Sequence, residues 1–415
     1  MTVGGRFAPS PADLIEERRS DSPCGLCGST DLKVLLRQRD VPVLCNVVWA
    51  TEEDARQAPT GDVELTFCRS CGAMHNEAFD PDLTRYSPAY ENSLHSSPRF
   101  QGFAEELARR LIRTYGLEGA TVVEIGSGRG EFLSLLCSLG VGRGIGYDPS
   151  YAGPPTDGSG RITFVSGHYP DASRDLPHAD LVCGRHVLEH VSHPPSFLQT
   201  LRAAVESESR TAVYVEVPDG GYMLREAALW DVIYEHPWYF TAPSLRRLFQ
   251  DSGFSVLDVG TSFGGQYLFI EARPDSLASS VRDAYDAEVQ TLAADADRFD
   301  GRCRRLIQTW GGWLQAERDA GHKVAVWGIG SKGTTFLNVV PGGEQVSSVV
   351  DLNERKHGRY VPGTGQRIVG PDGLRAAGAD VVLVMNPLYV EEVRQTTISL
   401  GLNARVLSLG DCGEG

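Results

Sequence analysis

The sequence has no long apolar run and fewer basic than acidic residues. No stretch approaches the roughly 18 apolar residues that a membrane-spanning helix needs, and residues 1–10 lack the apolar core of a secretory signal. The chain has 39 lysines and arginines against 54 aspartates and glutamates, a formal charge of -15. This charge disfavours attraction to a phosphate backbone. We expect a cytoplasmic protein with neither a membrane nor a nucleic acid as its partner.

Cysteine is scarce and odd in number, with nine residues among 415, which argues against a disulfide framework. Four of them form two Cys-x-x-Cys pairs, each followed by glycine: Cys24, Cys27, Cys68 and Cys71. Four thiolates suit a closed structural Zn²⁺ site, although two unrelated redox or core pairs are the alternative. We expect metal binding to fold this segment, which has few apolar residues, and we expect strands within the insert near 41–48 and 63–67.

The composition and hydrophobic pattern of the sequence change three times, and these changes predict an α/β protein of four parts. Residues 1–97 hold the cysteine pairs, and 98–275 alternate strand-like runs with helices, as in a doubly wound parallel sheet. Residues 276–320 form a polar helical bridge, and 321–415 form a smaller Rossmann-like α/β domain. Apolar spacing predicts a helix over 98–115 at the start of the second part.

A first glycine loop follows a β-branched strand and precedes a predicted helix over 131–139, so backbone amides face a ligand. Its residues of interest are Glu124, Gly126, Ser127, Gly128 and Gly130. The spacing is Gly-x-Gly-x-Gly, unlike the Gly-x-Gly-x-x-Gly of dinucleotide folds. Glu124 would repel a pyrophosphate but accommodate an ammonium group. Asp148 ends the next strand, where a carboxylate can accept ribose hydroxyls.

These motifs, with residues 180–191, resemble the S-adenosylmethionine (SAM) binding motifs of class I methyltransferases. The resemblance implies a class I methyltransferase core that binds SAM, with Arg185 after the fourth strand among the cofactor contacts. His186, His190 and His193 have spacings that could place metal ligands on one helical face. We disfavour that reading because the Leu-Glu-His-Val stretch is common in this class without a metal, and because Pro194 and Pro195 would end the helix.

A cluster of titratable and aromatic side chains follows the fifth strand, from Trp230 to Phe240. His236 has an ordinary pKa near neutrality, Glu235 beside it is a carboxylate that could orient its ring, and aromatic walls exclude water. This combination predicts a proton-transfer site with His236 as the base. The alternative is a core histidine with no chemical role.

The layout as a whole resembles the SAM-dependent deoxysugar C-methyltransferases of antibiotic pathways, including the tetronitrose type. The resemblance implies that His236 removes a proton beside the keto group of a nucleotide-linked sugar, that the enolate attacks the methyl sulfonium, and that Glu235 neighbours the base. It also places His190 in the same pocket and brings Tyr86 or Tyr90 to the site.

The sequence departs from this family at two places. The family reads Tyr-His-Glu-His, whereas Tyr234, which we carry over as an acceptor contact, directly adjoins Glu235 here. The family's Asn-Asn after the fourth strand is Arg185-His186. Both differences affect the acceptor pocket, so O-, N- or C-methylation of another small natural-product intermediate stays open.

A second glycine loop runs from Gly328 to Gly333 with the dinucleotide spacing, and Asp351 closes the next strand. The unit is too short for a complete dinucleotide fold, so we expect Gly330 and Lys332 to bind the diphosphate or nucleoside end of the acceptor. Alternatives are a unit that only packs, an NAD-dependent oxidoreductase, or a zinc adaptor without activity. The basic run 355–359 would face phosphate or solvent. Nothing indicates the oligomeric state.

Overall fold

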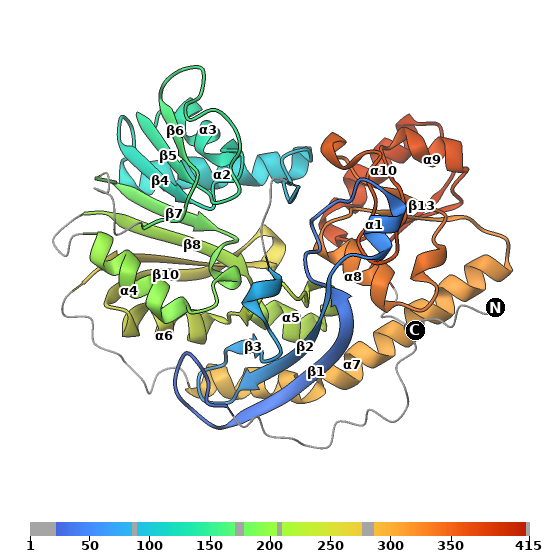
Figure 1. Cartoon of the computed structure of the whole chain (residues 1–415), viewed down its shortest axis with the longest axis horizontal. Coiled ribbons are helices and arrows are strands. Elements are labelled where there is room, and N and C mark those ends of the chain that lie inside the picture. The colour runs from blue at the N-terminus through green and yellow to red at the C-terminus, as the bar shows by residue number, and fades with distance from the viewer. Residues whose placement is uncertain (1–21, 85–88, 171–177, 206–209, 276–285, 412–415) are drawn as a thin grey trace.

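A computed structural model of the chain describes residues 22–84, 89–170, 178–205, 210–275 and 286–411 (Figure 1). It contains a four-stranded, a seven-stranded and a five-stranded sheet. No helix within these ranges is both long and apolar enough to cross a membrane. The α/β fold predicted from the sequence is confirmed.

The seven-stranded sheet forms the central part of the chain. Its spatial order is β10 (Phe254–Ser262), β11 (Tyr267–Pro274), β8 (Ala212–Pro218), β7 (Leu181–Arg185), β4 (Thr121–Ile125), β5 (Arg143–Tyr147) and β6 (Ile162–Val165). The strands from β8 to β6 are parallel, whereas β11 is antiparallel to both of its neighbours. The predicted parallel sheet therefore has an antiparallel hairpin at one edge. Its parallel strands bring the loops after β4, β7 and β8 to one edge.

Five helices accompany this sheet: α2 (Pro98–Tyr115), α3 (Glu131–Ser138), α4 (Pro194–Ala204), α5 (Gly220–Glu226) and α6 (Ala242–Asp251). The prediction of a helix over 98–115 is confirmed. The side chain of Ser97 caps its N-terminus by accepting a hydrogen bond from the Phe100 amide, and Gly116 ends it in the left-handed conformation. Phe100, Leu107 and Leu111 form part of its buried face.

The N-terminal sheet has the order β1 (Leu32–Pro42), β2 (Thr60–Cys68), β3 (Met74–Asn76) and β9 (Trp238–Tyr239), with helix α1 (Glu52–Arg56) between β1 and β2. The strand predicted at 63–67 lies within β2. The strand predicted at 41–48 is wrong, because β1 ends at Pro42 and the chain then turns. Strand β9 comes from the middle of the chain, so the sheet combines two distant segments.

The long helix α7 (Asp286–Asp319) lies within the stretch predicted as a helical bridge and runs beneath the N-terminal sheet toward the C-terminal sheet (Figure 1). Phe299 and Trp310 of α7 share one buried cluster with Leu35 and Phe67 of the N-terminal sheet and with Phe336 of the C-terminal part. The expectation of an N-terminal segment poor in apolar residues is thus corrected, because its sheet contributes to a large common core.

The C-terminal sheet is parallel throughout. Its order is β14 (Ile368–Val369), β13 (Ser348–Val350), β12 (Val324–Trp327), β15 (Val381–Val384) and β16 (Arg405–Ser408), accompanied by α8 (Ser331–Val339), α9 (Asp372–Ala377) and α10 (Val390–Ser399). This order reverses direction at β12, the position at which parallel sheets bind ligands. The second glycine loop leaves the sheet at that strand.

Candidate active site

The two cysteine pairs come together at one end of the N-terminal sheet. The Sγ atoms of Cys24 and Cys71 are 3.8 Å apart, those of Cys27 and Cys68 are 3.5 Å apart, and all four lie within 4.8 Å of one another. Ligands about 2.3 Å from a tetrahedral zinc ion are about 3.8 Å apart. The four cysteines therefore fit one structural Zn²⁺ ion with no open position.

The first glycine loop joins β4 to α3 and is packed tightly on one side. Gly126 and Gly130 have φ angles of +66° and +80°, and a Cβ atom there would lie 2.3 Å from Val187 and 2.4 Å from Phe164, respectively. At Gly128, with φ of +52°, a Cβ atom would meet nothing within 4 Å. The loop thus leaves open space over Gly128, where a ligand can approach the backbone.

Asp148 follows β5 and is directed at this loop. Its carboxylate accepts hydrogen bonds from the amide of Gly128 (2.9 Å) and from the amide (2.8 Å) and hydroxyl (2.6 Å) of Ser150. A carboxylate has about four acceptor positions. Asp148 therefore fixes the loop and keeps capacity for a further donor, and its predicted ribose contact stays a prediction.

Glu124, the last-but-one residue of β4, is buried beneath the loop. Its Oε2 atom and the hydroxyl of Ser127 have no hydrogen-bond partner. Burial raises the pKa of Glu124 to about 8, and the nearby Arg185 guanidinium acts in the opposite direction. Buried polar atoms without partners indicate a missing polar ligand, and the amino group of SAM fits this chemistry.

Arg185 ends β7 and lies between the loop and the next strand. Its Nε atom donates a hydrogen bond of 2.9 Å to Glu216, and its guanidinium lies 4.6 Å from the centre of the Phe132 ring. Its Nη2 atom has no partner. The ion pair holds the arginine in place with one donor uncommitted, and its predicted cofactor contact stays a prediction.

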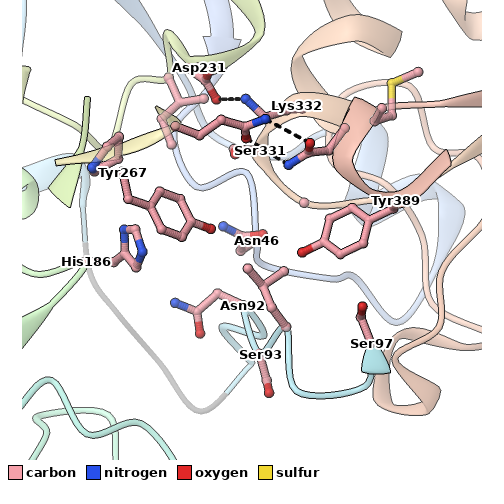
Figure 2. A pocket seen from close by; sticks show the side chains of 18 of the residues that line it. Asn46, Asn92, Ser93, Ser97, His186, Asp231, Tyr267, Ser331, Lys332 and Tyr389 are labelled. Atoms are coloured by element: carbon pink, nitrogen blue, oxygen red, sulfur yellow. Dashed lines mark hydrogen bonds and ion pairs between the residues drawn. The ribbon is translucent and has the colours of Figure 1, made fainter. Parts of the chain in front are cut away.

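A pocket of about 260 Å³, partly open to solvent, lies between the seven-stranded and C-terminal sheets. Three parts of the chain line it. The central part contributes His186, His190, His236 and Tyr267, the N-terminal part Asn46 and Tyr90, and the C-terminal part Gly330, Lys332 and Tyr389. Figure 2 shows His186 and Tyr267 on one side, Tyr389 on the other and Asn46 between them. The predicted base and the second glycine loop therefore share one pocket.

His190 and His236 form a pair in this pocket. Their rings make an edge-to-face contact with centroids 4.6 Å apart, and the Nδ1 atom of His190 is 2.9 Å from the carbonyl oxygen of Glu235. Burial, and then the neighbouring His190 and His186, lower the pKa of His236 well below its usual range. The imidazole is thus neutral near pH 7 and able to accept a proton.

The carboxylate of Glu235 is directed away from His236. It accepts a hydrogen bond of 3.2 Å from the Cys45 amide and another from the Tyr90 side chain. Burial raises its pKa to about 8, which those two hydrogen bonds oppose. The expectation that Glu235 orients the base through its side chain is corrected, because only its carbonyl oxygen contacts the histidine pair. Tyr90 lines the pocket as predicted, and Tyr86 lies outside the described residues.

Tyr234 is packed against the N-terminal sheet instead of the pocket. Its hydroxyl accepts a hydrogen bond of 2.8 Å from the Asp80 amide, its ring lies 5.5 Å from that of Phe79, and it is buried. The predicted acceptor contact of Tyr234 is wrong, because the N-terminal part encloses this side chain completely.

The N-terminal sheet holds His236 in place through the strand that follows it. Strand β9 pairs with β3, the Trp238 ring stacks on His75 at 5.1 Å, and the amide of Asn76 donates to the carbonyl oxygen of Pro237 at 2.9 Å. The aromatic residues after His236 were interpreted as pocket walls. Tyr239 does line the pocket, and the run of three aromatic residues from Trp238 to Phe240, a residue type that favours strands, was the signal for β9.

The three histidines after β7 do not share a helix face. His186 has a φ of +55°, a short 3₁₀ turn covers Leu188–His190, and His193 caps α4. Pro194 begins that helix, contrary to our expectation that it ends one. Sequence reasoning missed Glu189 in this turn, a buried carboxylate with donor atoms of His190 and His236 within 4.8 Å.

The second glycine loop precedes α8 and is also tightly packed. A Cβ atom at Gly333 would lie 2.2 Å from the carbonyl oxygen of Gly328. Gly330 lines the pocket at the N-terminus of α8, and Lys332 beside it forms an ion pair with Asp231 (Figure 2). Lys332 is therefore not a free point charge, and a phosphate would compete with Asp231.

The basic run after β13 is engaged within the protein. Arg355 donates to the carboxylate of Glu91 at 2.6 Å, and the buried Lys356 donates to the Ile329 carbonyl oxygen and lies 3.5 Å from Asp351. The expectation of a solvated run is corrected for Lys356, which is buried, whereas the Arg355 side chain is 42% exposed.

Two family models match the chain. One, described as a methyltransferase domain, covers residues 99–259, and the other, described as a C-methyltransferase C-terminal domain, covers residues 266–401. The first spans most of the seven-stranded sheet and the second spans the C-terminal sheet. The C-methyltransferase NovU of Streptomyces niveus is 26% identical over 399 residues, which cover 89% of this chain and 90% of NovU.

Solved methyltransferases resemble part of the chain. The 1,6-didemethyltoxoflavin-N1-methyltransferase of Burkholderia thailandensis is 16% identical, with a TM-score of 0.33, and the match covers 49% of this chain and 96% of that one. The N,N-8-amino-8-demethyl-D-riboflavin dimethyltransferase of Streptomyces davawensis is 21% identical, with a TM-score of 0.34, and the match covers 42% of this chain and 54% of that one.

Proposed function

We propose that this SAM-dependent methyltransferase, which matches the models of a methyltransferase domain and of a C-methyltransferase C-terminal domain, methylates a carbon atom of a nucleotide-linked keto-deoxysugar. One observation carries the proposal: the His190–His236 pair and the second glycine loop line the same pocket. A carbon nucleophile needs a base, and a sugar nucleotide needs a long site with a second binding end. We also propose that the enzyme works in the cytoplasm, where thiolates stay reduced.

The neutral His236 acts as the base. It takes the proton from the carbon beside the keto group, the C–H bond breaks, and the electron pair moves onto the carbonyl oxygen. SAM supplies the electrophilic methyl group. The enolate carbon would take that methyl group as the carbonyl re-forms, S-adenosylhomocysteine would be the leaving group, and His236 would hold the proton until it passes to solvent. The low exposure of His236, at 9%, limits the access of water to the base.

The first glycine loop holds the cofactor in this proposal. The open space over Gly128 admits the ligand, Asp148 accepts from the ribose, and Glu124 accepts from the amino group. On the C-terminal wall of the pocket, the backbone at Gly330 and the N-terminus of α8 face the acceptor's diphosphate. Lys332 contributes there if the phosphate displaces Asp231.

The test is the variant His236→Asn, which keeps a polar side chain but removes the base. We expect turnover to fall by about 100-fold or more, while calorimetry gives an unchanged affinity for S-adenosylhomocysteine, because the glycine loop is untouched. Turnover equal to wild type would eliminate His236 as the base. The matched variant His193→Asn changes a histidine that caps α4 outside the pocket, and it should retain activity.

A second candidate is methylation of a small natural-product intermediate without a diphosphate. The observation that favours it is the pairing of both pocket lysines, Lys332 with Asp231 and Lys356 with Asp351. Thermal-shift measurements with thymidine diphosphate separate the two. A sugar-nucleotide enzyme should be stabilised at millimolar ligand by mass action, and no stabilisation would favour the second candidate.

A further inference from the structure

Glu189 is a buried carboxylate without a hydrogen bond beside the proposed base. It lies in the 3₁₀ turn after β7 and is 1% exposed, and within the described part of the chain neither of its carboxylate oxygens has a hydrogen-bond partner. Oε1 is 3.4 Å from Nδ1 of His186, and donor atoms of His190 and His236 lie within 4.8 Å. A buried negative charge without compensation is costly, so a compensating cation is expected close by.

The permanent cation of this region is already engaged. Arg185 is bound to Glu216, which also lies 3.7 Å from Nε2 of His186. Glu235, on the opposite side of the pair, has a pKa of about 8 because of burial, so most of it is neutral near pH 7. Among the residues that the structure describes, the groups left to carry a positive charge next to Glu189 are therefore the histidines themselves.

His190 connects Glu189 to the base. Its Nδ1 atom is 2.9 Å from the Glu235 carbonyl oxygen, and a nitrogen of its ring lies within 4.8 Å of both a Glu189 oxygen and a His236 nitrogen. Burial lowers the pKa of His190, and the Glu189 carboxylate acts in the opposite direction. The edge-to-face contact with His236 then joins the two rings in one electrostatic unit. A proton placed on either imidazole is stabilised by the same carboxylate.

We propose that Glu189 is a positioning residue for the reaction: its carboxylate, acting through His190, stabilises the proton that His236 takes from the acceptor carbon. The inference rests on the proposed function for its role in turnover. The electrostatic coupling itself belongs to the free protein and needs no acceptor. No covalent step is added, because Glu189 only balances the charge that proton transfer creates on the histidine pair.

The direct test follows the histidines of zinc-loaded protein by NMR, with ¹³C at Cε1, in wild type and Glu189→Gln. The amide keeps the shape and removes the charge. We expect the protonation midpoint of the pair to move down by about one pH unit. His190→Gln and His236→Asn assign the signals. Glu271→Gln is the matched control: Glu271 is buried on β11 and bound to Arg110, so its loss should leave the pair's midpoint unchanged.

Kinetics give the second readout. In Glu189→Gln we expect kcat to fall about 10- to 100-fold with little change in KM. The acid limb of the pH profile should move to lower pH, because the pair then holds its proton less tightly. Glu189→Asp keeps the charge and should return the protonation midpoint most of the way to its wild-type value. This variant also keeps the test open if the glutamine variant does not fold.

Two results would overturn the inference. The first is an unchanged midpoint for both histidines in Glu189→Gln. The second is a metal equivalent beyond the one at the four cysteines, bound by wild type when titrated with Zn²⁺ or Mn²⁺ and lost in Glu189→Gln, since two histidines and a carboxylate are also a metal-binding set. Failure of the proposed function gives a different result. The wild-type enzyme then forms no C-methylated product, while the protonation midpoint still shifts in Glu189→Gln.

Discussion

Single residues next to the pocket have pKa values that burial moves far from their ordinary range. Glu235 is the clearest case for folding stability, because its pKa is about 8 in the folded protein and 4.5 for an unperturbed glutamate. Between these values the folded state holds a proton that the unfolded state releases. The contribution of this group to the free energy of unfolding is therefore fully present below pH 4.5 and is lost as the pH rises toward 8.

The variant Glu235→Gln tests this linkage. An amide resembles the protonated carboxyl but does not titrate, so we expect the Tm of the variant to fall less than the wild-type Tm between pH 6 and pH 8. The difference should be a few degrees, equivalent to roughly 1–2 kcal/mol. Scanning calorimetry of both proteins in the two buffers measures it, and parallel pH dependences would show that Glu235 is ionised in the folded state.

The residues of the glycine loop and of the histidine pair could be identified from the sequence, because their spacing and residue types reflect local chemistry. The directions in which the side chains of Glu235 and Tyr234 point could not be predicted from the sequence. Adjacent side chains in an irregular segment face wherever distant segments leave room, and Cys45, Tyr90 and Asp80, which receive them, lie far away in the sequence. Glu189 was missed because a 3₁₀ turn replaces the expected helix.

Among the elements, the loop from β4 to α3 makes the sharpest prediction. Gly126→Ala adds a methyl group 2.3 Å from Val187 at a φ of +66°, so the loop must move. We expect calorimetry to show at least a 10-fold weaker affinity for S-adenosylhomocysteine. Gly102→Ala, in the interior of α2 with nothing near its Cβ position, should bind normally and be more stable by about 0.5–1 kcal/mol. Equal affinities in both variants would remove the loop from the cofactor site.

Periodicity predicted α2 and the strands next to the two glycine loops, including β4, β5 and β13, but it gave no strand at β14 or β16. It failed for short ones. Strand β9 has only two residues, and its partner β3 lies in the N-terminal part, so its stability comes from pairing instead of local propensity. The prolines before α4 were interpreted as a stop signal, yet the first turn of a helix also tolerates proline.

For the whole molecule, the N-terminal sheet links the metal site to the chemistry. Cys68 ends β2 and Cys71 follows it. Strand β2 pairs with β3, and β3 pairs with β9, which begins two residues after His236. Removing the metal with a chelator should therefore lower both the Tm and turnover, and affinity for S-adenosylhomocysteine should change much less because the glycine loop lies on another sheet. Calorimetry and activity on the same chelated sample check this. Full turnover after complete metal loss would refute the link.

The pocket itself could not be predicted at this scale. Gln266 and Asn386 exchange two hydrogen bonds of 3.0 and 2.9 Å across it, yet no local signal in the sequence relates them. The C-terminal unit was expected to serve the acceptor because of its glycine spacing, and the structure places that loop on the pocket wall. Its contact with a diphosphate stays a prediction.

The central claim is the transfer of a methyl group from SAM to carbon. The most direct measurement incubates the zinc-loaded enzyme with ¹³C-methyl SAM and a thymidine diphosphate 4-keto-6-deoxysugar, followed by two-dimensional NMR of the product. The account predicts a labelled methyl carbon bonded to a sugar carbon next to the keto group, and no such product with His236→Asn. A labelled methyl on oxygen or nitrogen would contradict it.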